Sequence, residues 1–211
     1  MVMMNRIVFF MLALLFVACA RTPEDKALAL IREEVKESLC HPDSYEAAET
    51  VVDSAFSPKD DPVFFDKTLK VCRYAMEVEK YARLADQAER DVNIWKSVSG
   101  FEYKKSKAKK ELADARRQID RYTDKIQKVS QEMKAITDPG RRFIGFKVTH
   151  RFRFRDNSDN VVMGEKVFIT DKELTKVLAG YDTHDQDWLM VQALYQGLEE
   201  EEAEEYFDVP E

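Results

Sequence analysis

The feature that most constrains the fold of this chain is a repeat of apolar residues between Ala108 and Ile136. They recur at alternating intervals of four and three, at Ala108, Leu112, Ala115, Ile119, Tyr122, Ile126, Val129, Met133 and Ile136. Charged residues and glutamines fill nearly all the positions between them. This spacing predicts one long helix with a narrow apolar seam that needs a helical partner.

The partner helix is expected directly upstream, between Val71 and Val92. The same spacing recurs there more weakly, at Val71, Ala75, Val78, Ala82, Ala85 and Val92. Ser97, Ser99 and Gly100 supply a turn between the two runs. The sequence therefore predicts an antiparallel coiled-coil hairpin.

The hairpin is predicted to be an insertion over residues 61–139. Asp61-Pro62 is a cap followed by a favourable first helical residue, and Asp138-Pro139-Gly140 ends the returning helix. With Gly100 at the turn, the seams pair Ala85 with Leu112, Ala82 with Ala115, Val78 with Ile119, Ala75 with Tyr122 and Val71 with Ile126.

Residues 1–19 are predicted to be a signal peptide, because Arg6 is their only charge and residues 7–18 form an apolar run. A membrane anchor is the alternative, but spanning a bilayer takes roughly 20 apolar residues. The end of the run, Phe16-Val17-Ala18-Cys19, resembles the lipobox of bacterial lipoproteins. That resemblance implies lipidation of Cys19 and attachment to the outer membrane, on its periplasmic side or at the cell surface. Ordinary cleavage after Ala20, giving a soluble secreted protein, is a further alternative.

Export changes the interpretation of the two other cysteines, Cys40 and Cys72. An even pair in an oxidising compartment is compatible with a disulfide. The alternative is two small apolar residues in the interior. The sequence leaves these two interpretations open.

The segments outside the hairpin are predicted to form a small sheet with helices. Thr22-Pro23 opens a helix whose apolar stripe comprises Leu28, Ile31, Val35 and Leu39. Residues 45–56, 144–155 and 161–170 have the composition or alternation of strands. Pairing Arg155 with Val161 across the second hairpin sets Phe152 beside Gly164 and Arg151 opposite Glu165.

Two further helices are expected near the C-terminus. Thr170-Asp171-Lys172-Glu173 has the pattern of a capping box, and Gly180 would end the short helix that it opens. A last amphipathic helix is expected from Thr183 to about residue 198. Residues 199–211 carry eight acids and no base, and we expect them to form a solvated tail.

The predicted fold class is α+β, a small antiparallel sheet with flanking helices and the long hairpin inserted between strands 1 and 2. The body is expected to be discontinuous, over residues 20–60 and 140–198. Its outer pieces resemble small exported modules of uncharacterised Bacteroidetes lipoproteins, in which a helix ending in a turn like Cys40-His41-Pro42-Asp43-Ser44-Tyr45 precedes a strand and a hairpin. The resemblance implies no catalytic residues.

No motif in the sequence predicts an enzyme, a metal site or a cofactor. His41 lies beside a proline, His150 on the apolar side of a strand, and His184 within an acidic helix start. None has a second ligand at metal-binding spacing, and glycine-rich phosphate loops and nucleophile elbows are missing from the sequence. The net charge of -7 does not favour nucleic-acid binding.

The sequence favours a cell-envelope lipoprotein that presents its hairpin to an envelope protein or polymer. A module that binds a small molecule or lipid in a pocket of the body is the alternative. The candidate contact surface is the turn of the hairpin, where Trp95, Val98, Phe101 and Tyr103 are followed by Lys104, Lys105, Lys107, Lys109 and Lys110. Rings beside a basic patch favour an acidic partner. Alternatively, the rings close the hairpin and the lysines are its solvated face.

Overall fold

The computed structural model describes residues 22–207, with side chains as far as residue 197. The predicted signal peptide and Cys19 lie outside the described residues. The elements are α2 (Pro23–Glu37), the 3-10 turn η1 (Pro42–Ser44), β1 (Glu46–Ser57), α3 (Pro62–Lys96), α4 (Glu102–Thr137), β2 (Arg142–Arg155), β3 (Val161–Thr170), β4 (Val177–Asp182) and α5 (Gln186–Phe207).

The α+β fold class is confirmed, with a long helical hairpin between the first two strands. The chain forms two compact units. The sheet unit comprises residues 22–55 and 145–182 of the described chain, and the helical unit comprises residues 56–144 and 183–207.

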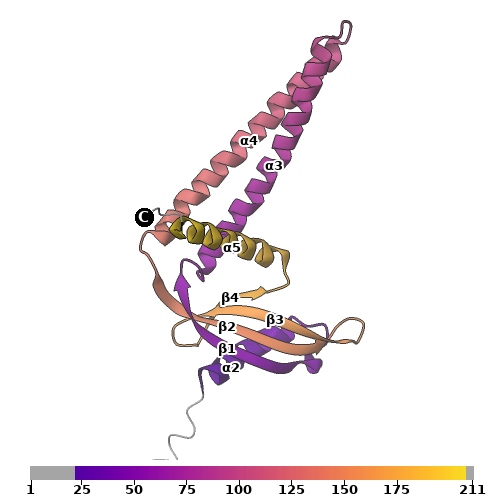
Figure 1. The fold of residues 1–211 in the computed structure, drawn as a ribbon. Helices are drawn as coiled ribbons and strands as arrows, with labels where there is room; N and C mark the ends of the chain where they lie inside the picture. Colours follow the sequence, from indigo (N-terminus) through magenta and orange to yellow (C-terminus); the bar gives the residue numbers. More distant parts are fainter. Residues whose placement is uncertain (1–21, 208–211) are drawn as a thin grey trace, which may run out of the picture. The chain divides into compact units, whose positions relative to one another are not determined.

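The sheet unit is a four-stranded antiparallel sheet in the order β1-β2-β3-β4, with α2 across one face (Figure 1). Its core joins Ala27, Ile31 and Val35 of α2 to side chains of β2 and β3, namely Val148, Phe152 and Phe168. The helix starts as predicted, because the Thr22 hydroxyl accepts a hydrogen bond from the Asp25 N–H. Ala27 takes a central place in the core, where the predicted stripe had Leu28, which is half-buried.

The predicted register of β2 and β3 is confirmed. Arg155 pairs with Val161, Phe152 with Gly164, and Arg151 with Glu165. Arg151 Nε donates to the Glu165 carboxylate at 2.5 Å. A Cβ at Gly164 would lie 2.6 Å from the Phe152 ring, so the missing side chain leaves space for that ring.

The predicted short helix from Thr170 to Gly180 is wrong, because residues 171–176 connect β3 to β4 without a helix and β4 begins at Val177. Thr170 already pairs with Phe146 in the sheet, and its hydroxyl donates to the Phe146 carbonyl oxygen at 3.3 Å, so the capping box does not form. The Asp171 carboxylate accepts hydrogen bonds from the backbone N–H groups of Thr175 and Lys176 instead, and these close a turn. Gly180 pairs with Phe168 in β4.

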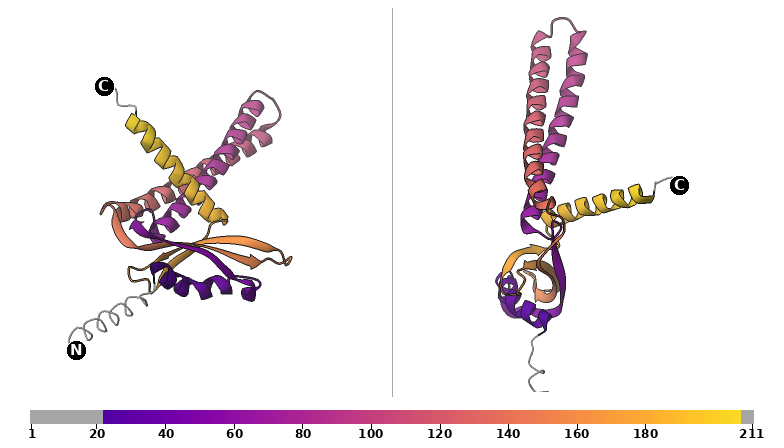
Figure 2. Two further views of the ribbon diagram at one scale, coloured as in Figure 1. Left: turned by 60° about the horizontal axis from the view of Figure 1, so that its bottom comes forward. Right: turned by 90° about the vertical axis from the view of Figure 1, so that its left-hand side faces the viewer.

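The helical unit is built on α3 and α4, which lie side by side and antiparallel along their length (Figure 2). The Asp61 carboxylate accepts from the Val63 N–H at 2.9 Å at the start of α3. Gly100, with φ of 85°, lies in the turn between the helices. All nine predicted seam positions of α4 are buried or half-buried, with Ala108, Ala115 and Val129 the most buried.

The predicted seam of α3 needs a correction at its basal end. Ala75 is exposed, whereas the neighbouring Tyr74 contacts Tyr122 with ring centroids 5.9 Å apart. Tyr81 stacks on the same ring at 6.0 Å. A regular spacing of three and four joins buried and half-buried positions of α3, at Val71, Tyr74, Val78, Tyr81, Ala85, Ala88, Val92 and Trp95. The predicted seam residue Ala82 is also half-buried, beside Tyr81. Tyrosine rings supply the apolar surface that the prediction assigned to small alanines.

The last helix, α5, packs on the base of α3. Trp188 stacks on Phe65 at 5.8 Å between centroids, Tyr195 on Phe64 at 6.4 Å, and Asp187 accepts from Arg73 at 2.6 Å. The helical backbone continues to Phe207, so it includes much of the acidic run that was expected to be a tail. Glutamate and alanine are strong helix formers, which accounts for the extension.

Candidate interaction site at the hairpin tip

The candidate contact residues lie where α3 ends and α4 begins. We define the tip segment as residues 94–110, which include the turn and the five predicted lysines. Ser97 caps the C-terminus of α3, and Phe101 precedes α4 without a side-chain hydrogen bond to its first turn. The hairpin therefore delivers the aromatic and basic side chains to one end of the helical unit.

Two of the tip rings pack against each other. The centroids of Trp95 and Phe101 are 5.3 Å apart, and the ammonium group of Lys104 lies 4.4 Å from the Trp95 centroid. It also lies 5.2 Å from the Phe101 centroid. These contacts match the interpretation in which rings close the hairpin, with a cation–π contact holding Lys104 in place.

The remaining apolar side chains of the tip are exposed to solvent. Tyr103 is 81% exposed, Ile94 56% and Val98 38%, and Phe101 of the packed pair is itself 42% exposed. The sequence analysis did not select Ile94. The corrected α3 repeat could have identified it, because Ile94 falls between the seam residues Val92 and Trp95 and therefore points away from the seam. The tip thus combines a packed pair of rings with apolar groups that are available for contact.

The lysines of the tip segment form few and long ion pairs. Lys105 lies 3.9 Å from Glu102, and Lys107 lies 3.7 Å from Glu111. Within the described part of the chain, Lys109 and Lys110 form no ion pair. Across residues 94–110 there are six lysines and one glutamate, a net charge of +5. The tip is therefore a locally basic surface on a chain whose net charge is -7.

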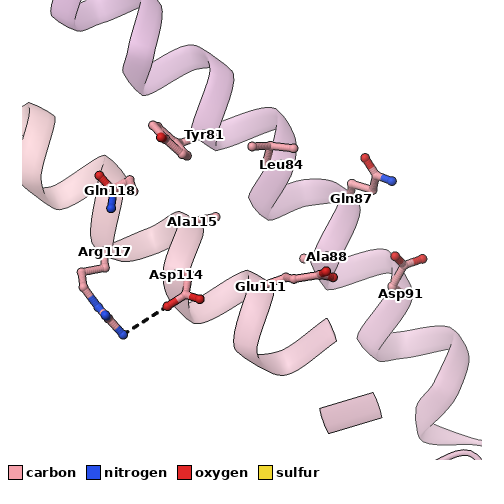
Figure 3. A pocket seen from close by; sticks show the side chains of 10 residues that line it. All are labelled: Tyr81, Leu84, Gln87, Ala88, Asp91, Glu111, Asp114, Ala115, Arg117 and Gln118. Atoms are coloured by element: carbon pink, nitrogen blue, oxygen red, sulfur yellow. Dashed lines mark ion pairs between the residues drawn. The ribbon is translucent and has the colours of Figure 1, made fainter. Parts of the chain in front are cut away.

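A hollow of about 550 Å³ lies on one side of the hairpin, below the tip (Figure 3). Ala88 and Ala115 contribute to it, and Asp91, Glu111 and Asp114 add carboxylates. Arg117 forms an ion pair with Asp114 at 3.4 Å. The small seam alanines produce a hollow between the helices, and its lining is mixed and partly paired, unlike the mostly apolar lining of ligand pockets.

The two candidate disulfide cysteines are free thiols in the structure. Cys40 is exposed and belongs to the sheet unit, whereas Cys72 is half-buried and belongs to the helical unit. Burial raises the pKa of the Cys72 thiol, which lowers its reactivity at neutral pH. Neither thiol forms part of the tip.

The histidines do not converge on a site. His150 is fully buried in the sheet unit, where its Nε2 lies 2.8 Å from the Tyr45 hydroxyl oxygen. His41 and His184 are exposed. Among the described residues, no group of three or more His, Cys, Asp or Glu side chains is arranged to hold a metal ion.

Comparisons with known proteins give no relative for this chain: no family model, curated protein or solved structure matches it. Among the helices of residues 22–207, none combines the length and apolar content that crossing a bilayer requires. The functional proposal therefore depends on the predicted signal peptide and on the geometry of the tip.

Proposed function

We propose that the protein is a cell-envelope lipoprotein that acts as a structural or interaction module and presents its hairpin to an acidic partner. The apolar run at residues 7–18 and the lipobox-like Phe16-Val17-Ala18-Cys19 support export and lipid attachment at Cys19. The observation that carries the proposal is the exposure of Tyr103, at 81%, beside a basic segment. A turn with only a structural role needs no exposed ring.

The length of the hairpin supports a presenting role. The helices α3 and α4 have 35 and 36 residues, which corresponds to arms of about 50 Å at 1.5 Å per residue. Ion pairs join the arms, with Lys67 2.5 Å from Glu132 and Arg116 3.7 Å from Glu89. The tip therefore extends far beyond the base, where α5 packs.

The alternative proposal is a module that binds a small molecule or lipid. It would need a pocket in the body, but the space between α2 and the sheet is filled by buried side chains of Ile31, Val35 and Phe152. The hollow on the hairpin is the other place for a ligand, and its carboxylates disfavour an acyl chain. Both observations favour the interaction module.

The contact proposal is tested with a photo-crosslinking amino acid at position 103 in cells. Lys128, exposed near the base of α4, gives a matched control position. We expect adducts from position 103 that position 128 does not give. Equal adduct yields from the two positions, or none from position 103, would contradict a working surface at the tip.

The anchoring proposal is tested separately with Cys19→Ala. Without the lipidated cysteine, we expect the exported protein to move from the membrane pellet to the soluble fraction. Retention of the variant in the pellet after a carbonate wash would reject lipidation at Cys19 as the anchor.

A further inference from the structure

We infer that the partner of the tip is the surface of an anionic lipid bilayer, into which the exposed apolar side chains insert. This inference rests on the proposed function, since it assumes that the tip is the working end of the hairpin. It commits to one chemistry: phosphate headgroups for the lysines and the acyl boundary for Ile94, Val98 and Tyr103.

The kind of basic residue favours a diffuse anionic surface. All six cations of residues 94–110 are lysines, and the nearest arginines are Arg90 and Arg116. Arginine is the residue that recognises carboxylate or phosphate groups bidentately, as a specific protein site would require. Lysine acts as a flexible point charge and is attracted to anionic lipids without fixed geometry.

The size of the tip disfavours a folded protein partner. Two helices of about 10 Å diameter present an end face on the order of 200 Å². A stable protein interface buries about 800 Å² on each side, in shape-complementary contact. Insertion into a fluid interface needs neither that area nor a matching shape, because lipids rearrange around the inserted groups.

The order of residues along α4 fits the layers of a leaflet. Tyr103 lies in the first turn, and Lys104 to Lys110 follow over about 10 Å of helix rise. The headgroup layer is roughly 5–8 Å thick on each side of the hydrocarbon core. With Tyr103 at the acyl boundary, where aromatic rings of membrane proteins gather, the long lysine side chains reach the phosphates.

The charge is also graded along the hairpin. Beyond Lys110, Glu111 and Asp114 are balanced by Arg116 and Arg117, so the net charge falls from +5 in the tip segment to zero over residues 111–117. An anionic surface therefore attracts the tip segment more strongly than the part of α4 that follows it. The concentration of positive charge at the end of the hairpin therefore favours a shallow contact made end-on.

The experiment uses the full chain with Cys19→Ala, recovered from the exported soluble fraction, so that no lipid anchor contributes. Trp188→Phe leaves Trp95 as the reporter at the tip, since the chain has two tryptophans. Vesicles of phosphatidylcholine with phosphatidylglycerol, carrying bromine on the acyl chains, are compared with phosphatidylcholine alone and with soluble polyglutamate. Flotation measures binding, and quenching of Trp95 fluorescence measures insertion.

We expect binding to the anionic vesicles, with Trp95 quenched by the brominated chains, and weak binding to polyglutamate. Replacing Lys107, Lys109 and Lys110 by glutamine should lower the partition coefficient on the order of 100-fold at low salt. The matched control replaces Lys70, Lys128 and Lys134, which are exposed lysines away from the tip, and should change it less than about threefold. Tyr103→Ser with Ile94→Ser should abolish quenching without changing the melting temperature, because both side chains are more than half exposed.

Two outcomes would overturn the inference. If polyglutamate binds as tightly as the vesicles and Trp95 stays unquenched, the tip binds soluble polyanions. If the unsubstituted chain does not float with anionic vesicles at low salt, the bilayer is not its partner. In either case, adducts from position 103 in cells would leave the proposed interaction role intact. If position 103 also gave no adducts in cells, the proposed interaction role would be rejected as well.

Discussion

The two units of this protein bury different kinds of side chain. The sheet unit excludes water from large groups, with Ile31 0%, Phe168 1% and Phe152 2% exposed. The most buried seam positions in the half of the hairpin nearest the tip are alanines, including Ala88, which is 4% exposed, and Ala108, which is 3% exposed. Burying a large apolar side chain contributes about 1.5–3 kcal/mol, whereas one methyl group contributes less than about 1 kcal/mol.

This difference indicates two routes to stability. In the sheet unit, a few large side chains from segments distant in sequence share one core, so each of them carries a large part of the stability. In the hairpin, many small contributions from neighbouring turns add up along the helices. We therefore expect a single truncation to damage the sheet unit most, and only insertion of charge to damage the seam severely.

The largest expected effect is that of Phe152→Ala. The ring lies in the core of the sheet unit and covers Gly164, so its removal leaves a cavity. We expect a loss of about 3–5 kcal/mol in the free energy of unfolding. Because the hairpin lacks this core, its helical circular dichroism should persist while the sheet unit unfolds.

Phe143→Ala on the same strand is the control. Because Phe143 is 37% exposed, this substitution should lower the free energy of unfolding by less. A single transition, in which the helical signal and the sheet signal are lost together, would break the comparison between the units.

The second prediction sharpens the corrected α3 seam. Ala85 is 8% exposed, so Ala85→Glu would place a carboxylate between the helices. We expect it to cost about 2–3 kcal/mol in urea unfolding followed by helical circular dichroism. Ala75→Glu is the matched substitution on the exposed side of the same helix and should change stability by less than about 0.5 kcal/mol. Equal losses of stability in the two variants would indicate that Ala75 belongs to the seam.

These two positions also show how far the sequence allowed the fold to be predicted. The α4 seam was predictable because its apolar residues alternate with charged ones, so only one helical face is apolar. In α3 the apolar residues are spread more widely, and both Tyr74-Ala75 and Tyr81-Ala82 offered two candidates for one seam position. Tyr74 contacts Tyr122 while Ala75 is exposed, and Tyr81 stacks on the same ring beside the half-buried Ala82. Sequence spacing does not contain that information.

The β strands show the same limit. The register of β2 and β3 followed from a short turn and from the complementary pair Arg151 and Glu165. The fourth strand was missed because Thr170 to Glu173 satisfies a local helix-start pattern, whereas the sheet pairing of Thr170 with Phe146 is long-range. At the tip, the sequence identified the aromatic residues, but only the structure distinguishes the packed Trp95 from the exposed Tyr103.

A third prediction concerns the turn that replaced the expected helix. Asp171→Ala removes the acceptor of the Thr175 and Lys176 N–H groups, so β4 should lose its fixed start. We expect faster amide hydrogen exchange over Val177–Asp182, with a smaller loss of stability than Ala85→Glu causes. Asp171→Asn keeps one side-chain oxygen as an acceptor, so its exchange rates should lie between those of the unsubstituted protein and those of Asp171→Ala. Unchanged exchange in Asp171→Ala would mean that pairing with β3 alone fixes β4.

The smallest expected effect tests the buried polar group of the sheet unit, His150, whose solvent exposure is 0%. Its Nδ1 lies 3.1 Å from the Glu49 carbonyl oxygen, which only accepts hydrogen bonds, so Nδ1 carries the proton of the neutral ring. Nε2 then accepts from the Tyr45 hydroxyl at 2.8 Å. The folded state therefore satisfies the neutral imidazole.

Burial lowers the pKa of His150 below its ordinary value of 6.5, and Arg32 lowers it further, while the hydrogen bond to Glu49 acts in the opposite direction. The unfolded chain therefore binds a proton at a higher pH than the folded protein does. The contribution of His150 to stability is complete above pH 6.5. It is lost as the pH falls from 6.5 toward the pKa of His150 in the folded protein, which is lower. We expect the urea midpoint of the sheet unit to fall over that interval, and the hairpin to respond less. His150→Gln should remove this part of the pH dependence, whereas His41→Gln, at an exposed position, should keep it. A midpoint in His150→Gln that falls as steeply as in the unsubstituted protein would assign the acid sensitivity to other groups.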